Sequence, residues 1–266
     1  MIKLLTLSNF CPNRIFRCKV IDILCSNKGL FFPSAAHKIC EIYNDMECNV
    51  NKYLATAPKV KIYPLNQKDL NCIINRDKLG CGTLSCGHDL PVWINDPEKA
   101  KYRIMVLSQD PRRNKKEMGS MEIGISSPFG LHSIYWRSNK RTGMIHQMAQ
   151  CIIEKYGEDV CFYYTDILKL RKTDSKDMDN KNMETYKDIL AKEIKLFNPT
   201  IILLLGKIAQ NVYNSMNCYC KAHIIELPHP NARMINGTWG NYTSTDKCDT
   251  EWKKKIICDE IEKYLK

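Results

Sequence analysis

The sequence predicts an α/β fold in which three layers, α/β/α, enclose a central, mainly parallel four-stranded sheet. The first observation is a set of four short, continuous apolar runs, which are typical of strands buried on both faces. The second is that helical patterns alternate with these runs, as in parallel sheets covered by helices. The third is that 44% of the 266 residues are hydrophobic and 26% are charged, which suffices for a full core.

Four strands and four helices make up the predicted main domain at 98–266. The strands are predicted at residues 103–108, 160–164, 201–205 and 223–227. The helices are predicted at residues 141–156, 183–197, 207–216 and 249–265. Two long connections, 111–139 and 172–182, are polar or charged and are predicted to be loops.

Residues 1–97 are predicted to be an N-terminal extension. Pro33-Ser34 is typical of a helix start with Ser34 as N-cap, and apolar residues then recur at helical spacing over 35–48. Residues 56–66 are expected to be extended and 77–97 irregular. We expect this extension to pack on the main domain; a separate module is the alternative, since no clear linker decides between the two.

The formal net charge is +11, which favours an anionic partner such as nucleic acid, although it can also serve solubility. Four basic clusters are present: Arg112, Arg113, Lys115 and Lys116; Arg137, Lys140 and Arg141; Lys169, Arg171 and Lys172; and Lys253, Lys254 and Lys255. Each alone is typical of a solvated face, but the first follows a predicted strand directly.

The sequence has no bilayer-spanning apolar run and no export signal. We therefore expect an intracellular protein, cytoplasmic or, in a eukaryote, nuclear or organellar.

The chain has 14 cysteines. Five residues are candidate metal ligands: Cys81, Cys86, His88, Cys218 and Cys220. Their spacing matches no standard zinc pattern, and free buried cysteines are common core residues. The pattern therefore favours core cysteines over a metal site.

Three of the predicted strands end at a polar residue: Asp110, Asp166 and His229. Residues just past the carboxyl ends of parallel strands face the ligand crevice of an open α/β sheet. The convergence of two carboxylates and an imidazole predicts a catalytic crevice. For Asp110 alone, an ordinary Asp-Pro turn is an equal alternative.

Four segments resemble the uracil-DNA glycosylase superfamily over roughly 98–250. Leu-Ser-Gln-Asp-Pro at 107–111 is similar to its Gly-Gln-Asp-Pro water-activating motif, and Ser-Pro-Phe-Gly at 127–130 to its base-stacking loop. Tyr-Thr-Asp-Ile-Leu-Lys-Leu-Arg at 164–171 is similar to the strand end that bears its base-recognising Asn. Pro-His-Pro-Asn-Ala-Arg at 228–233 is similar to its His-Pro-Ser-Pro-Leu motif. Residues 186–205 resemble the same stretch of the iron–sulfur branch, which is the closest in layout.

The resemblance implies roles for individual residues. Asp110 would stabilise the sugar cation and orient a water, and His229 would donate a hydrogen bond to the departing base. Phe129 would stack on the flipped base; the alternative places Ile125 there and Phe129 in the core. Base binding is assigned to Gln109, Phe129, Asp166 and Thr165, where Thr165 replaces Asp166 in the other alignment. DNA binding is assigned to Arg112, Arg113, Lys115 and Arg233. Arg233 stands where the family places the side chain that intercalates into the duplex as a wedge; the alternative is an ordinary surface arginine.

The sequence also departs from the family pattern. Ser108 replaces the first Gly of the water-activating motif, Arg112 stands where classical members have a Tyr that excludes thymine, and Asp166 replaces Asn. The cluster cysteines of the iron–sulfur branch are not matched, since Leu170 and Tyr186 stand in that region. We therefore expect no iron–sulfur cluster and no other cofactor.

Three hypotheses for function follow. The first is a monomeric DNA glycosylase that leaves an abasic site in DNA. The second is a catalytically impaired DNA-binding protein on the same fold, and the third is a small-molecule nucleoside or nucleotide hydrolase, which does not need a charge of +11. Uracil is the default base. An ionised Asp166 would instead suit a cytosine-type or other modified base, since it can only accept hydrogen bonds.

Overall fold

The structure is a computed structural model. It describes residues 7, 9–26, 29–51, 63–65, 86–109, 111, 123–138, 143–172, 182–216, 218, 220–230, 232, 239 and 249–266. Within these residues, every helix is too short or too polar to cross a bilayer.

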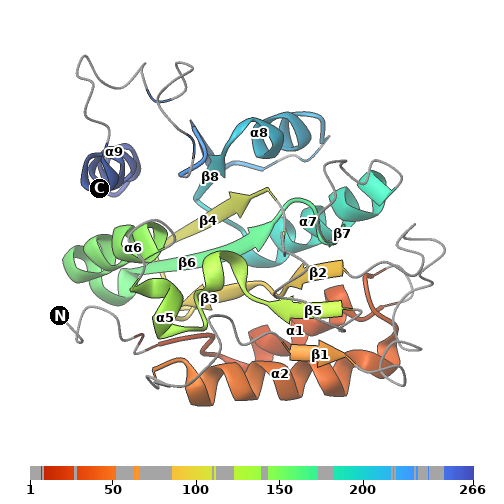
Figure 1. Cartoon of the computed structure of the whole chain (residues 1–266). Coiled ribbons are helices and arrows are strands. Elements are labelled where there is room, and N and C mark those ends of the chain that lie inside the picture. The colour runs from red at the N-terminus through yellow and green to blue at the C-terminus, as the bar shows by residue number, and fades with distance from the viewer. Residues whose placement is uncertain are drawn as a thin grey trace.

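A five-stranded sheet in the order β3-β6-β4-β8-β9 forms the centre of the molecule (Figure 1). Its strands are β3 (Val92–Ile94), β4 (Tyr102–Ser108), β6 (Val160–Asp166), β8 (Ile201–Leu205) and β9 (His223–Leu227). The strands β6, β4, β8 and β9 are parallel, and they are the four strands that the sequence predicts. The prediction of an α/β fold with a mainly parallel central sheet is thereby confirmed.

The fifth strand, β3, corrects the prediction of an irregular segment at 77–97. It pairs antiparallel with β6, with Trp93 opposite Tyr163. Farther upstream, Phe10 forms a β-bridge to Ile94, and the Cys11 amide donates to the Trp93 carbonyl at 2.8 Å. Residues from the N-terminal segment thus complete one edge of the central sheet.

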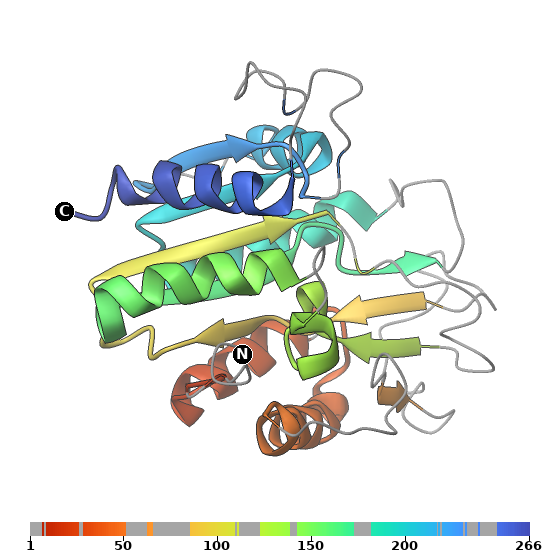
Figure 2. The same cartoon turned by 60° about the vertical axis from the view of Figure 1, so that its left-hand side comes forward.

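Helices cover both faces of this sheet (Figure 2). On one face, α6 (Gly143–Tyr156) contacts β6, α9 (Thr250–Glu262) contacts β9, and the two helices contact each other. On the other face lie α7 (Met183–Phe197) and α8 (Lys207–Asn214), with α1 (Arg14–Leu24) packed on α7. A short η4 turn (Gly157–Asp159) leads from α6 into β6. The main-domain helices confirm the predicted positions, with ends that differ by a few residues.

A second, smaller sheet lies beside the central one in the order β1-β5-β2-β7. Its strands are β1 (Tyr63–Leu65), β2 (Cys86–Asp89), β5 (Ile123–Ser126) and β7 (Arg171–Lys172). The predicted loop at 111–139 also contains η3 (Pro128–Gly130) and α5 (Ile134–Arg137). The prediction of an irregular segment at 77–97 is therefore wrong for the strands at 86–89 and 92–94, and that of a loop at 111–139 is wrong for 123–126, 128–130 and 134–137. The strands here are short, β2 and β5 each contain a glycine, and they pair with partners elsewhere in the chain.

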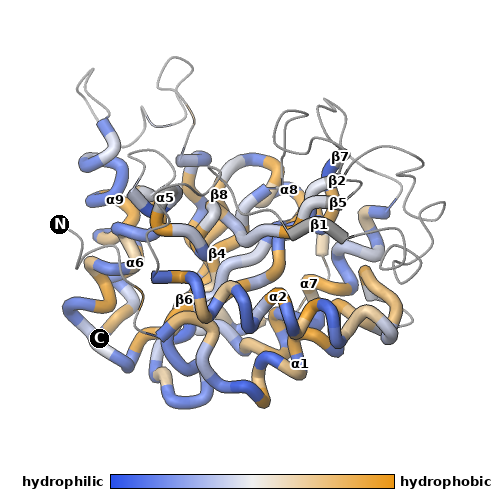
Figure 3. Tube along the Cα trace, turned by 60° about the horizontal axis from the view of Figure 1, so that its bottom comes forward, coloured by the Kyte–Doolittle hydropathy of each residue, from blue (hydrophilic) through white to orange (hydrophobic). Residues whose placement is uncertain are grey.

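The N-terminal helix predicted at 35–48 is confirmed as α2 (Ala36–Asn49), preceded by η2 (Pro33–Ala35). The predicted N-cap is wrong: the residue before the helix is Ala35, and Ser34 lies inside the 3-10 turn. Figure 3 shows α2 changing repeatedly between hydrophilic and hydrophobic residues along its length. Its buried side chains are Ile39, Ile42, Tyr43 and Met46, which confirms the amphipathic pattern.

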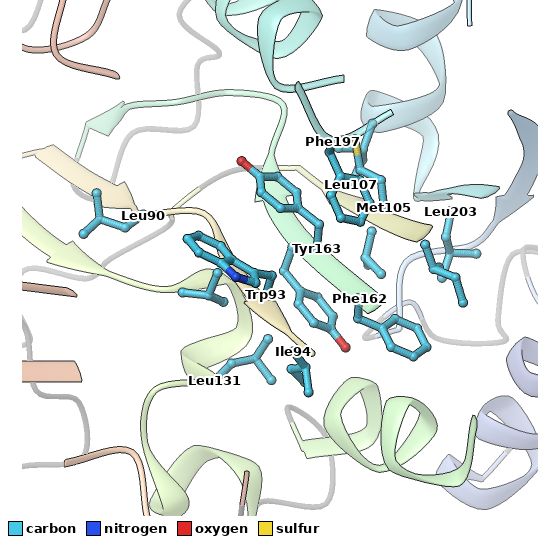
Figure 4. Close-up of a cluster of buried hydrophobic side chains, with 14 of the residues drawn as sticks. Leu90, Trp93, Ile94, Met105, Leu107, Leu131, Phe162, Tyr163, Phe197 and Leu203 are labelled. Carbon is cyan, nitrogen blue, oxygen red and sulfur yellow. The ribbon is translucent and has the colours of Figure 1, made fainter. Parts of the chain in front are cut away.

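An aromatic cluster joins the N-terminal segment to the central sheet (Figure 4). The Trp93 ring stacks on Tyr163 at 6.2 Å between centroids, and the edge of Phe16 meets it at 5.0 Å. On the α7 side, Tyr163 lies 4.9 Å from Phe197. The indole of Trp93 donates to the Pro12 carbonyl at 2.8 Å, so its polar atom is satisfied within the core.

We expect Trp93→Ala to lower the free energy of unfolding by about 3–5 kcal/mol, because it leaves a cavity among packed aromatic rings. Urea unfolding followed by circular dichroism measures this change. Ile15→Ala is the matched control, since Ile15 lies in α1 and is 66% exposed, and a surface truncation changes stability by about 0.5 kcal/mol or less. Equal losses for the two variants would contradict the assignment of this cluster to the core.

Candidate active site

The carboxyl ends of the parallel strands lie side by side. β4 and β6 pair in register through Ser108 and Asp166, and the pairing continues beyond the strands. The Ile167 amide donates to the Ser108 carbonyl and the Leu168 amide to the Gln109 carbonyl, both at 3.0 Å. These bonds fix the segment around Gln109, which is partly exposed, against the turn that follows β6.

Asp166 and Ser108 form a buried hydrogen-bonded pair at the carboxyl ends of β6 and β4. The Ser108 hydroxyl donates a hydrogen bond to Asp166 Oδ1. The two residues are 6% and 2% exposed, for Ser108 and Asp166 respectively. Sequence analysis identified Ser108 only as a departure from a motif and not as a contact of Asp166, because the contact depends on the register of two strands 58 residues apart.

Thr165 points to the opposite face of the sheet, because side chains alternate along a strand. Its hydroxyl lies 3.2 and 3.3 Å from the two carboxylate oxygens of Glu193 on α7. The Lys169 ammonium donates to the Thr165 hydroxyl at 2.6 Å and to Glu193 Oε2 at 2.5 Å. The Tyr163 hydroxyl lies 3.4 Å from Glu193 Oε1. Burial is the main cause that holds the pKa of Tyr163 well above its usual value, and the negative charge of Glu193 is the second. The Thr165 hydroxyl is thus hydrogen-bonded on the α7 face of the sheet, opposite to the face toward which Asp166 points.

Three of the basic residues predicted to lie on solvated faces are buried instead. Lys169 is 1% exposed and pairs with Glu193, and Arg171 is 6% exposed within β7. Arg137 is 1% exposed and donates at 2.5 Å to the carbonyls of Leu131 and Val50. The sequence pattern is misleading here, because some of the groups that satisfy these cations lie far away along the chain, such as Glu193 for Lys169 and the Val50 carbonyl for Arg137.

The segment containing Phe129 forms a tight turn next to β6. Phe129 lies in η3 with φ 56°, in the left-handed region that few residues other than glycine adopt. The turn is held by Ser127, whose hydroxyl lies 2.8 Å from His132 Nδ1 and accepts from the His132 amide at 3.1 Å. Phe129 is partly exposed, whereas Ile125 in β5 is fully buried. Only Phe129 of these two therefore presents a surface on which a ring can stack.

His229 follows β9, at the end of the neighbouring pair of strands. The Gly206 amide, directly after β8, donates to the Leu227 carbonyl at 2.8 Å. Gly206 has φ 94°, and a Cβ added to it would lie only 3.1 Å from the Cβ of His229. The backbone turn after β8 therefore lies close to His229 and restricts the position of the His229 Cβ atom.

The carbonyls around His229 are held by two residues that sequence analysis did not single out as site residues. The indole of Trp239 donates to the His229 carbonyl at 3.3 Å. The Lys253 ammonium, from α9, donates to the carbonyls of Pro230 and Ala232 at 3.0 and 2.9 Å and lies 5.4 Å from the Trp239 ring. Lys253 thus ties the segment that follows His229 to a helix, which corrects its interpretation as part of a solvated face.

We expect Lys253→Met to lower the rate of any reaction that depends on His229 by roughly ten- to a hundredfold, because the segment loses two bonds that set its position. Single-turnover kinetics measure the rate, and Lys255→Met is the matched control, since Lys255 is an exposed residue of the same helix. Equal rates for these two variants would show that Lys253 has no positioning role.

Several predicted site residues lie outside the described part of the chain: Asp110, Arg112, Arg113, Lys115 and Arg233.

Of the candidate metal ligands, Cys81 also lies outside the described part of the chain. Among the described residues, no three His, Cys, Asp or Glu side chains gather to form a metal site. The buried His88 presents Nδ1 to the Lys169 carbonyl at 2.6 Å, and Leu170 and Tyr186 are core side chains. Burial raises the pKa of Cys11 and of Cys25 to about 12, as expected for thiols that serve as core residues.

Comparison with known families gives one match. The family model described as "Uracil DNA glycosylase superfamily" matches residues 97–254, from just before β4 into α9. The matched region contains all four parallel strands and the segments around Ser108, Phe129, Asp166 and His229. None of the curated proteins compared with the chain matches it.

Proposed function

Because the chain belongs to the uracil-DNA glycosylase superfamily, we propose that it is a DNA glycosylase that hydrolyses the N-glycosidic bond of uracil or a modified base and leaves an abasic site. One observation carries the proposal: the segments after β4, β6 and β9 lie along one edge of the sheet, beside the turn that presents Phe129. In the proposed site, these segments supply a group for the sugar, a group for the base and a ring on which the base stacks.

The chemistry follows from where charge develops. As the glycosidic bond breaks, the sugar becomes positive and the base becomes negative. In the proposed mechanism, Asp110 stabilises the sugar cation and orients a water. This water attacks the anomeric carbon and passes a proton to the Asp110 carboxylate. His229 donates a hydrogen bond to the base oxygen as the bonding electrons move onto the base. The reaction needs no cofactor.

Recognition of the base is assigned to the neighbouring segments. The target nucleotide leaves the duplex and stacks on Phe129, while Asp166 and Gln109 lie at the edge of the base. Between Asp166 and Thr165 we favour Asp166, since the hydroxyl of Thr165 is engaged with Glu193 and Lys169 beneath the sheet.

DNA binding is assigned to Arg112, Arg113, Lys115 and Arg233. We expect the double variant Arg112→Ala/Lys115→Ala to bind duplex DNA more weakly and with less dependence on salt, because fewer phosphate contacts release fewer counterions. The slope of log K against log salt should become shallower by roughly two. Fluorescence anisotropy across a salt series measures this slope. An unchanged slope would place the DNA-binding surface elsewhere on the protein.

The direct test of the proposed function is incubation of the protein with single- and double-stranded DNA that carries uracil, hypoxanthine, xanthine or a modified cytosine. Alkali then cleaves the strand wherever an abasic site has formed. We expect cleavage at the position of at least one of these bases. Salt-dependent duplex binding without any cleavage would support the non-catalytic DNA-binding alternative, and activity on free nucleosides without DNA binding would support a small-molecule hydrolase.

A further inference from the structure

We propose that Ser108 is a specificity-determining residue, which together with Asp166 forms one acceptor unit that selects a base with an exocyclic amino group, as in cytosine and its modified forms, over uracil. This inference rests on the proposed glycosylase function and concerns which base that site accepts.

The first observation is the contact itself. Ser108 and Asp166 are opposite one another in the parallel pairing of β4 and β6, and the Ser108 hydroxyl donates to Asp166 Oδ1. Tyr163 and Thr165 point toward Glu193 on α7, so alternation along β6 directs Asp166 to the other face. The acceptor unit is therefore separated from the buried Lys169–Glu193 ion pair by the sheet.

The second observation is that the unit is held firmly in place. The backbone carbonyl of Ser108 accepts from the Ile167 amide, and the carbonyl of Gln109 accepts from the Leu168 amide. Ser108 thus contacts the segment around Asp166 through both its side chain and its backbone. The direction of the carboxylate is set by the ends of two strands rather than by a loop, which gives it the fixed geometry that selective hydrogen bonding requires.

The third observation is that both positions are among those at which this sequence departs from the family motifs it resembles. Ser108 stands in place of a glycine, which has no side chain, and Asp166 stands in place of an asparagine. An asparagine carries no charge, so its burial does not call for a donor that stabilises a carboxylate. A buried aspartate does gain from one, and the hydroxyl of Ser108 supplies it. The two departures thus meet in one hydrogen-bonded pair.

The chemistry of the pair determines which base fits. In this buried pair the Ser108 hydroxyl is the donor and the Asp166 carboxyl is the acceptor. A serine hydroxyl has one proton, and that proton is directed to Oδ1. An acceptor facing the O4 atom of uracil meets a second acceptor, while an exocyclic amino group at the same position donates to it.

The test compares selectivity in five proteins: the parent, Ser108→Ala, Ser108→Thr, Asp166→Asn and the double variant Ser108→Ala/Asp166→Asn. The measured quantity is the ratio of kcat/KM for a modified cytosine to that for uracil, in otherwise identical duplexes. Binding to duplexes with non-cleavable 2′-fluoroarabino forms of the same two nucleotides gives a second readout that needs no catalysis. Circular dichroism verifies that each variant is folded.

We expect the parent to prefer the amino-bearing base and Ser108→Ala to shift the ratio toward uracil by roughly tenfold or more. Ser108→Thr keeps the hydroxyl and should keep the parental preference. Asp166→Asn should also shift toward uracil, and adding Ser108→Ala to it should change the ratio no further, because the pair acts as one unit.

Three results would overturn the inference while leaving the glycosylase function intact: a parent that prefers uracil, a Ser108→Ala ratio equal to that of the parent, or additive effects in the double variant. A parent that neither cleaves nor selectively binds any of the bases would overturn the proposed function, and this inference with it.

Discussion

Asp110→Asn is expected to lower kcat/KM for base release by about a hundredfold or more, because a neutral amide cannot stabilise the positive charge that develops on the sugar. Asparagine has nearly the same size as aspartate, so the variant removes the charge and leaves the volume of the site unchanged. Single-turnover kinetics on the preferred substrate measure the chemical step apart from product release.

The matched control for this variant is Asp159→Asn, an identical change at an exposed position in η4. It should cleave at the parental rate. Asp110→Asn should also bind substrate DNA at least as well as the parent does, since it carries one negative charge fewer. A variant at Asp110 that cleaves as fast as the control would show that this residue is only part of an Asp-Pro turn.

His229→Ala is the second change with a large expected effect. We expect a loss of about a hundredfold or more in the rate of base release, because the base leaves as an anion without the hydrogen bond that stabilises it. The loss should be in kcat rather than in substrate affinity, since the bond strengthens only as negative charge develops on the base.

His223→Ala serves as its control, since His223 is an exposed histidine at the other end of β9, where it stacks on Tyr264 at 4.3 Å between ring centroids. It should leave the rate of base release unchanged. Comparable losses in the two variants would mean that His229 acts through the stability of β9 and not on the base.

Much of the fold was predictable because parallel strands buried on both faces leave a clear pattern in sequence. The apolar runs around Val106, Phe162 and Leu203 had only one plausible structure, and the intervening helices had regular spacing. In contrast, β3 and β5 are strands of three and four residues, and β5 contains a glycine, so neither leaves a distinctive pattern. Their pairing is decided by partners elsewhere in the chain.

Of the candidate site, only the meeting of the strand ends was predictable, because parallel topology brings the carboxyl ends of the strands to the same end of the sheet. What the sequence could not provide is which side chains touch. The bond between Ser108 and Asp166 needs the register of β4 against β6, and the bonds from Lys253 need the position of α9 over the His229 segment. Each of these contacts joins residues that are distant in sequence.

The same reason explains why basic residues were misinterpreted. Lys169 belongs to a run of basic residues in the sequence, which suggests a solvated face. In the structure its charge is neutralised by Glu193, which comes from the middle of α7. A buried ion pair of this kind leaves no local signal in either of the two segments.

The measurement that tests the central claim most directly is the simultaneous detection of both products from one reaction. A duplex with a single modified base is incubated with the protein; the released free base is quantified by mass spectrometry and the abasic site by alkaline strand cleavage. The glycosylase mechanism predicts equimolar amounts of the two products from the parent, and about a hundredfold less of each from Asp110→Asn over the same early time course. Duplexes that remain bound but intact, with no free base from any substrate tested, would contradict it.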